Sequence, residues 1–191
     1  MKYKLLLASK SPRRREILDL LRIPYTIVTI DGIDESYPDN LDPDQVSEYI
    51  ANKKADAFEK IISDEEILIT ADTVVICDGK ILGKPKGVED AKEMLRFLSG
   101  KTHKVTTGVS VSTKEKRVSF TSDSYVTFAE LTDKEIEYYV EMYHPLDKAG
   151  AYGIQEWIGA VAVAKIDGSF YNVMGLPVHK LYQMLKQFQE E

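Results

Sequence analysis

Residues 67–82 read Ile-Leu-Ile-Thr-Ala-Asp-Thr-Val-Val-Ile-Cys-Asp-Gly-Lys-Ile-Leu, and this stretch decides the fold class. Its apolar, β-branched part, 67–77, predicts one long buried strand. Asp78-Gly79 is a typical two-residue hairpin turn, so residues 80–82 are predicted to pair back onto that strand. The charged residue within 67–77 is Asp72. The sequence therefore predicts a β-hairpin with a carboxylate in the middle of its longer strand.

Strand and helix signals alternate on the amino-terminal side of this hairpin, and a second hairpin follows on the other side. The predicted strands are 3–8, 25–30, 67–77, 80–82, 104–113, 117–130 and 160–166. Helices are predicted to begin at Ser11-Pro12, at Asp42-Pro43, at Val88, at the capping box 132–135 and at Pro177. This order is typical of a mixed α/β fold, and we predict a single domain over residues 1–191.

The composition excludes several classes of protein. The chain has 191 residues, 25 Lys+Arg against 31 Asp+Glu and a net charge of −6. One cysteine, Cys77, rules out an intramolecular disulfide and a zinc site built from several thiolates. No apolar run approaches the roughly 20 residues of a membrane span. We therefore expect a cytoplasmic soluble protein that inserts into no membrane, and the acidic balance argues against a nucleic-acid-binding module.

The segment 9–15, Ser-Lys-Ser-Pro-Arg-Arg-Arg, has an unusual charge for a helix start. With Ser11 as N-cap, three arginines occupy the first turn, where the helix dipole favours acidic residues. A bound anion would reverse that penalty, because free amides, serine hydroxyls and arginine forks together form a phosphate site. The alternative is that the arginines pair with Glu16, Asp19 or the acidic loop at 31–44.

Asp72 is the next candidate. A carboxylate within an apolar strand is costly unless it is paired or holds a metal, and such costs persist mostly at functional sites. Asp72 is suited to hold Mg²⁺ together with phosphate oxygens, or to take a proton from water. The alternative is an aspartate bonded to the backbone at a bulge.

Three further features have both a functional and a plain interpretation. Lys84, in the turn Leu-Gly-Lys-Pro, is either a phosphate-binding charge or a solvated lysine. Of Lys53 and Lys54, one is expected either to extend its ammonium to solvent or to point into a site. The small-residue loop 149–155 ends in Gln155, whose amide can both donate to and accept from a nucleobase edge. The alternative is a plain glycine loop before a strand. His103 is interpreted as a loop or strand-edge residue.

These segments together resemble the Maf family of nucleoside triphosphate pyrophosphatases. The matching segments are 7–15, Asp34-Glu35, Lys54-Ala55, 71–75, 82–85, 98–103, 147–155 and 171–177. The resemblance implies a Maf/ITPase-like fold, with a mixed, twisted, elongated sheet flanked by helices and two lobes around a central cleft. It also implies hydrolysis of a nucleoside triphosphate between the α and β phosphates, a divalent cation (Mg²⁺ or Mn²⁺), and in many members a homodimer.

The resemblance also implies roles for single residues. Asp72 would be the proton acceptor, and Asp72 and Glu35 would be the metal ligands, with Asp34 as a weaker alternative to Glu35. The residues that would bind the substrate are Ser9, Arg13, Arg14, Glu35, Lys54 and Lys84. Whether Asp72 is the base or only a metal ligand stays open at this point.

Arg13, Thr73 and Gln155 match the specificity positions of the subgroup that acts on dTTP and UTP. We therefore predict hydrolysis of these two nucleotides and of modified pyrimidine relatives, rather than of 7-methyl-GTP. After Gln155 the chain has Glu-Trp-Ile, where many members of the family have a short glycine-rich run. A non-catalytic nucleotide-binding regulator of cell division is the alternative from another class.

Overall fold

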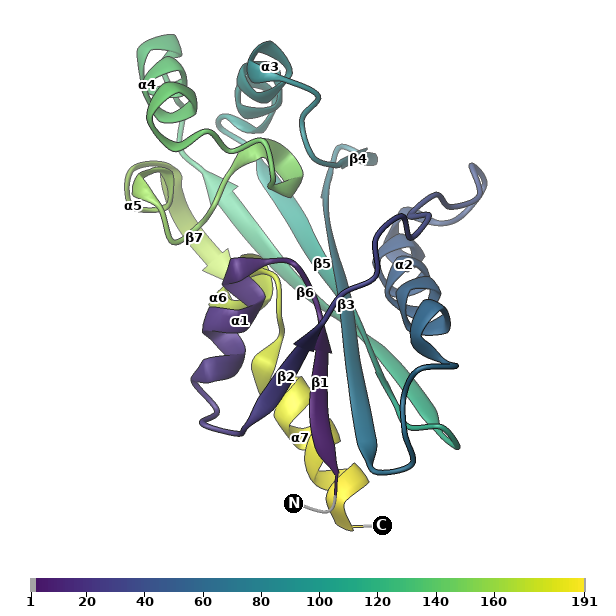
Figure 1. The fold of residues 1–191 in the computed structure, drawn as a ribbon. Helices are drawn as coiled ribbons and strands as arrows, with labels where there is room; N and C mark the ends of the chain where they lie inside the picture. Colours follow the sequence, from purple (N-terminus) through teal and green to yellow (C-terminus); the bar gives the residue numbers. More distant parts are fainter. Residues whose placement is uncertain (1–2, 191) are drawn as a thin grey trace. The chain divides into compact units, whose positions relative to one another are not determined.

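The structure is a computed structural model that describes residues 3–190 (Figure 1). In chain order its elements are β1 (Lys4–Ala8), α1 (Pro12–Asp19), β2 (Tyr25–Val28), α2 (Pro43–Phe58), β3 (Glu66–Cys77), β4 (Lys80–Leu82), α3 (Val88–Leu98), β5 (Thr102–Ser112), β6 (Arg117–Phe128), α4 (Asp133–Tyr143), the 3-10 turn η1 (Ala149–Ala151), α5 (Trp157–Ala162), β7 (Val163–Asp167), α6 (Phe170–Met174) and α7 (Val178–Glu190). The predicted mixed α/β class is confirmed.

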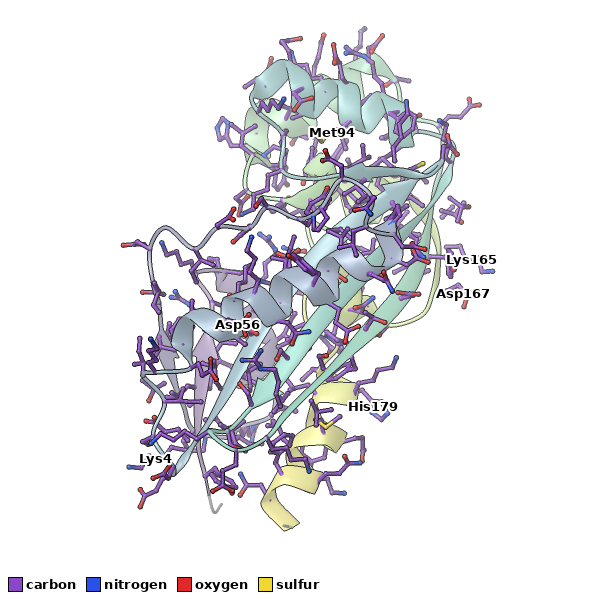
Figure 2. All side chains as sticks on the ribbon, turned by 90° about the vertical axis from the view of Figure 1, so that its right-hand side faces the viewer. Lys4, Asp56, Met94, Lys165, Asp167 and His179 are labelled. Carbon is purple, nitrogen blue, oxygen red and sulfur yellow. The ribbon has the colours of Figure 1, made fainter. Side chains whose placement is uncertain are left out.

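The strands pair in the order β2-β1-β3-β5-β6-β7, and β4 pairs with β3. β1 is parallel to both β2 and β3, because α1 and α2 return the chain to the same end before each new strand. β3 with β4, and β6 with β7, are antiparallel, so the predicted mixed sheet is confirmed. β7 is an edge strand, and its exposed Lys165 and Asp167 (Figure 2) are charges of the kind that discourage pairing with another chain.

Residue contacts divide the chain into two compact units. Unit 1 contains the described residues up to Asp72, Thr107–Ser122, and those from Gly175 onward. Unit 2 contains Thr73–Thr106 and Asp123–Met174. β3, β5 and β6 each contribute residues to both units, and each unit is described by itself below. The single domain and the central cleft stay predictions.

Unit 1 has helices on both faces of its strands. One face packs against α2 through a buried cluster of Leu6, Ala55, Phe58, Ile62 and Leu68. Because side chains alternate along a strand, Leu5 and Leu7 point to the other face, where Figure 1 shows α1 and α7. The loop from β1 into α1 therefore leaves a strand that is buried on both sides.

Gly108 of β5 sets how closely α2 approaches the strands of unit 1. A Cβ atom at this position would overlap the backbone of Ser47 and Glu48 in α2. The hydroxyl of Thr70 in β3 also donates to the carbonyl oxygen of Ala51, at 2.7 Å. These backbone contacts hold α2 against β3 and β5, and so they fix the position of every side chain that α2 presents.

Unit 2 contains α3, α4 and a buried group of three rings, those of His103, Phe128 and Tyr152. An ion pair between Arg96 and Asp133, 2.7 Å long, joins α3 to the start of α4. The predicted capping box is present, because the Thr132 side chain caps α4 while the Glu135 carboxylate returns to the Thr132 backbone. The hairpin turn at Asp78-Gly79 is also confirmed, with positive φ at both residues.

Three local predictions were wrong. Residues 157–162 form helix α5 rather than the start of a strand, so β7 covers only 163–167, and the short helix α6 was not predicted. Gly159 explains part of this, since any Cβ there would overlap the carbonyl oxygen of Ile154 as the chain turns into α5. The spacing along the second helix predicts an inner face of Val46, Tyr49, Ile50, Ala57 and Ile61, but Tyr49 and Ala57 of α2 are exposed, as is Ile61 beyond its end. The small residue Ser47 is buried where the helix backbone approaches Gly108 of β5.

Candidate functional site

The loop from β1 into α1 has the predicted helix start. The Ser11 hydroxyl accepts the Arg14 amide at 3.5 Å, and Pro12 is the first helical residue. The hydroxyl of buried Ser9 accepts the Ser11 amide at 3.1 Å. The two serines thus shape the backbone ahead of α1, and the amide of Arg15 donates to the Ser11 carbonyl oxygen at 3.4 Å. The positive end of the helix dipole at this point favours an anion.

Arg14 is held in place by a distant part of unit 1. Its Nε donates to the carbonyl oxygen of Gly175, at 2.8 Å. Burial lowers the pKa of Arg14, and the charges of Asp72 and Glu35 offset part of that effect. Arg13 acts on Arg14 in the same direction as burial. The structure therefore brings Arg13, Arg14, Glu35 and Asp72 within electrostatic reach of one another, and Gly175 was missed by sequence reasoning although it lies in the matching segment 171–177.

Asp72 and Lys54 form a nearly buried ion pair. Lys54 Nζ lies 2.8 Å from Asp72 Oδ1 and 3.2 Å from Glu35 Oε1. The side chains of Lys54 and Asp72 are each 13% exposed. Asp72 is thus no aspartate bonded to the backbone at a bulge, and Lys54 is the lysine that points into the site. Holding these charges away from water is expensive unless each is well paired, which favours a functional reason for the cluster.

Lys53 anchors the acidic loop that carries Glu35. Its ammonium donates to the Asp34 carboxylate at 2.7 Å and to the carbonyl oxygen of Ser36 at 2.8 Å. Hydrogen bonds from Lys53 and from Ser36 hold the pKa of Asp34 well below its usual range. Because both neighbours of Glu35 are engaged, Glu35 alone of the pair Asp34-Glu35 is presented to Lys54. This anchoring role of Lys53 was not predicted.

Glu35 and Asp72 fit a divalent cation of the magnesium kind. Such ions take one or two carboxylates and complete their shell with water and substrate phosphates. The two carboxylates contact the same ammonium, so both present an oxygen to one positive charge. Among residues 3–190 there is no cluster of three or more His, Cys, Asp or Glu side chains suited to a metal. The donor set therefore suits an ion that shares substrate oxygens.

In unit 2 the structure gathers the segments of the remaining predicted residues. Thr73 directly follows Asp72 in β3, and Lys84 is exposed in the turn after β4. The Gly83 carbonyl oxygen accepts the Gly150 amide at 3.1 Å, which joins the Lys84 turn to the loop 149–155. Gly150 in turn presses on Val75, where a Cβ would come within 3.1 Å of the side chain. The strand, the turn and the loop thus pack together, and the Gln155 side chain at the end of the loop is exposed.

His103 is a core residue of β5 rather than a loop residue. It is 1% exposed, its Nε2 lies 2.7 Å from the Tyr152 hydroxyl, and its ring meets Phe128 edge-to-face at 5.0 Å. Its Nδ1 is buried without a hydrogen-bond partner among the described residues. Burial lowers the pKa of His103 from 6.5 to about 4 and raises the pKa of Tyr152.

We expect His103 to make stability fall as the pH is lowered. Between pH 6.5 and about 4 the unfolded chain protonates this histidine while the folded chain does not. The contribution is fully present above the unfolded pKa and amounts to about 3 kcal/mol of unfolding free energy once it is lost. Urea denaturation at several pH values should therefore show a shallower pH dependence for His103→Gln than for the wild type. His179→Gln is the control, because His179 lies exposed on α7 (Figure 2) and its loss should leave the dependence unchanged.

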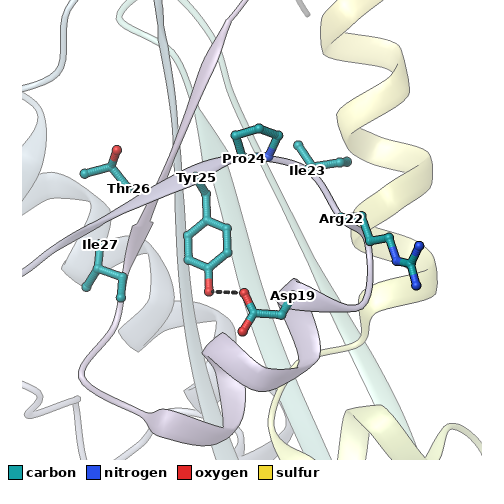
Figure 3. Close-up of a pocket in the computed structure, with 7 residues that line it drawn as sticks. All are labelled: Asp19, Arg22, Ile23, Pro24, Tyr25, Thr26 and Ile27. Carbon is teal, nitrogen blue, oxygen red and sulfur yellow. Dashed lines mark hydrogen bonds between the residues drawn. The ribbon is translucent and has the colours of Figure 1, made fainter.

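Unit 1 also has a surface pocket, which lies away from the predicted site residues. Figure 3 shows it between the end of α1 and the start of β2, lined by Asp19, Arg22, Ile23, Pro24, Tyr25, Thr26 and Ile27. Asp19 accepts a hydrogen bond from the Tyr25 hydroxyl at 2.7 Å. β1 and β2 are parallel, so the start of β2 lies at the opposite strand end from the loop after β1. Ligands of open α/β sheets bind at the carboxyl ends of the strands, and this pocket contains none of the predicted site residues.

No helix within residues 3–190 combines the length and the apolar character needed to cross a bilayer.

Comparisons with known proteins show which family the chain matches. The family model described as "Maf-like protein" matches residues 4–188. A dTTP/UTP pyrophosphatase of Bacteroides thetaiotaomicron is 55% identical over 186 residues, which cover 97% of this chain and 96% of that protein. The protein of the same name from Porphyromonas gingivalis is 54% identical over 191 residues, covering 99% and 96%. The one from Flavobacterium johnsoniae is 46% identical over 184 residues, covering 96% and 94%.

Among solved structures, the Ham1 protein of Staphylococcus aureus matches with a TM-score of 0.49 and 14% identity, covering 66% of this chain and 72% of that one. That likeness is too weak to support an argument. The family match, in contrast, spans nearly the whole chain and is accompanied by relatives more than 50% identical to it. The chain belongs to the Maf family.

Proposed function

We propose that this protein is a nucleoside triphosphate pyrophosphatase that hydrolyses dTTP and UTP between the α and β phosphates, releasing the monophosphate and pyrophosphate. The observation that carries the proposal is the nearly buried cluster in which Lys54 joins Asp72 and Glu35, within electrostatic reach of Arg14. Its support is the family membership, together with relatives that are named dTTP/UTP pyrophosphatase.

The triphosphate is assigned to the loop and first turn of α1. Arg13, Arg14 and Ser9 supply guanidinium and hydroxyl donors there, beside the positive end of the helix dipole. Pyrophosphate leaves with negative charge on its β and γ phosphates, so donors fixed before the reaction stabilise the transition state more than the substrate. The hydrogen bond from Arg14 to Gly175 serves this purpose, because it fixes the guanidinium in advance.

We assign to Asp72 the role of accepting the proton of the attacking water. The ion pair with Lys54 holds this nearly buried carboxylate in a fixed position before the substrate arrives. The positive charge of Lys54 offsets the repulsion between the carboxylates of Asp72 and Glu35. An incoming triphosphate offers the Lys54 ammonium a further anionic partner.

The family also suggests a divalent cation, Mg²⁺ or Mn²⁺, which Asp72 and Glu35 would hold. When bound, such an ion supplies neutralising charge to the phosphate oxygens during their displacement. Glu35 is suited to this role because Lys53 fixes the residues on either side of it.

Base recognition is assigned to Arg13, Thr73 and Gln155, and Lys84 is assigned to the phosphates. Thymine and uracil present carbonyl oxygens and an N–H on one edge, which one amide side chain such as Gln155 can match with a donor and an acceptor. The substrates belong to the cytoplasmic nucleotide pool, so we place the protein in the cytoplasm. The homodimer stays a prediction.

The test is pyrophosphate release with Mg²⁺ or Mn²⁺ from dTTP, UTP, CTP, GTP, ATP and 7-methyl-GTP, with every product identified. We expect monophosphate and pyrophosphate from dTTP and UTP, at rates at least about tenfold above those of the other nucleotides. Turnover of 7-methyl-GTP instead would overturn the assignment of the base. Tight nucleotide binding without any turnover would overturn catalysis and favour a regulator.

A further inference from the structure

Glu156 directly follows Gln155, and its carboxylate lies in an unusually buried environment. The Glu156 side chain is 19% exposed and that of its ion-pair partner Lys148 is 9% exposed. We propose that Lys148, Glu156 and Tyr139 form a positioning network that holds Gln155 in place and thereby sets the discrimination between nucleobases. This inference rests on the proposed function, in which Gln155 recognises the base.

The network is closed by hydrogen bonds. Lys148 Nζ lies 3.2 Å from Glu156 Oε1, while the Tyr139 hydroxyl donates to Glu156 Oε2. The same hydroxyl accepts the backbone N–H of Gly153, at 2.9 Å. Tyr139 is fully buried on α4, so this chain of bonds connects the rigid helix directly to the backbone of the loop.

Gln155 stands within a turn whose two ends belong to this network. The Glu156 amide donates to the Gly153 carbonyl oxygen at 3.0 Å, which closes a four-residue turn over 153–156. One end, Gly153, is held by Tyr139, and the other end, Glu156, is held by Lys148 and Tyr139. Ile154 is buried and Gln155 is exposed, so the turn is anchored on both sides of the one side chain that it presents to solvent.

Packing reinforces the hydrogen bonds. A Cβ atom on Gly153 would come within 2.9 Å of Glu156 Cδ and 3.1 Å of Lys148 Cε. The loop backbone therefore lies directly on the ion pair, and a smaller side chain at 156 would leave space into which the turn can relax. A loosened turn would present Gln155 in several orientations, and the hydrogen bonds that distinguish one base from another would weaken.

A purely structural role for the ion pair makes a different prediction. If Glu156 only balanced the buried charge of Lys148, its removal would lower stability and leave the preference among bases unchanged. Asp147 Oδ1 also lies 2.9 Å from Lys148 Nζ, so Lys148 keeps one partner when Glu156 is replaced. We therefore expect the variants at 156 to fold, which permits their kinetics to be compared.

The experiment measures kcat and KM for dTTP and CTP in Glu156→Ala, Glu156→Gln, Tyr139→Phe and Gln155→Ala, with folding checked by thermal unfolding. We expect Glu156→Ala and Tyr139→Phe to lower the dTTP/CTP ratio of kcat/KM by about tenfold, mostly through KM. Glu156→Gln should recover part of the ratio, since its amide oxygen still accepts from Tyr139. The double variant of Gln155→Ala and Glu156→Ala should be no less selective than Gln155→Ala alone.

Two matched controls lie at exposed positions outside the network. Glu141→Gln on α4 and Tyr125→Phe on β6 make the same chemical changes there and should leave the ratio unchanged. An unaltered dTTP/CTP ratio in a folded Glu156→Ala protein would overturn this inference alone. A wild type without preference for dTTP would overturn the proposed function, and this inference with it.

Discussion

Replacing Asp72 with asparagine is expected to lower kcat for pyrophosphate release from dTTP by about 10²–10⁴-fold. Asparagine keeps the shape of the side chain and an oxygen that accepts from Lys54, but it has neither the charge nor the basicity to take a proton from water. Lys54 keeps Glu35 as an ionic partner at 3.2 Å, so the fold should survive. Steady-state kinetics together with the unfolding temperature separate these two effects.

The control for this variant is Asp56→Asn. Asp56 lies on the same helix as Lys54 but on its exposed surface, where it pairs with Arg117 (Figure 2). Its activity should stay within about twofold of the wild type, as a change in an exposed ion pair has little effect. Full activity of Asp72→Asn would contradict the assignment of Asp72, whereas activity restored by raising the Mg²⁺ concentration would identify it as a metal ligand rather than the base.

Gly108→Ala is expected to lower the free energy of unfolding by about 3 kcal/mol, a large part of the stability of an ordinary domain. The added Cβ atom meets backbone atoms of Ser47 and Glu48, which cannot move aside as a flexible side chain could. Either α2 shifts away from β5 or the strand bends, and in both cases buried contacts are lost. Urea denaturation followed by circular dichroism measures the change.

Because α2 also carries Lys54, Gly108→Ala should impair activity even at temperatures where the variant is folded. Gly83→Ala is the matched control for stability, since a Cβ there has no atom within 4 Å and the residue has no positive φ. Its free energy of unfolding should change by less than about 0.5 kcal/mol. Equal stability of Gly108→Ala and the wild type would show that α2 does not depend on this close contact.

Sequence patterns predicted the elements whose signals are local. The long strand with Asp72, its hairpin turn at Asp78-Gly79 and the capping box of α4 all depend on residues a few positions apart, and all are present. Helix α5 was missed because its boundary depends on the fit of Gly159 against the carbonyl of Ile154. The inner face of α2 was predicted only in part, since Val46 and Ile50 are buried whereas Tyr49 is exposed, and the contact of Ser47 with Gly108 joins elements far apart in the chain.

In the candidate site, too, local features were predictable and long-range contacts were not. The residue types at Arg13, Arg14, Glu35, Lys54 and Asp72 were predictable from charge placement and family resemblance, and the structure brings these five together. Their supporting contacts were not predictable, because they join residues far apart in the chain. Gly175 supports Arg14 across 161 positions, and Lys53 reaches back 19 positions to Asp34. No local pattern identifies such partners.

The order of the segments in the two units has a consequence for synthesis on the ribosome. Unit 2 is complete in the chain once Met174 has been made, whereas unit 1 still needs the residues from Gly175 onward. Contacts between residues distant in the chain form late in folding. The strands of unit 1 thus leave the ribosome long before α7 can cover them and before Gly175 can hold Arg14. The part of unit 1 to which we assign phosphate binding is therefore assembled late, and we expect a nascent chain that has not reached Gly175 to lack the hydrogen bond that positions Arg14.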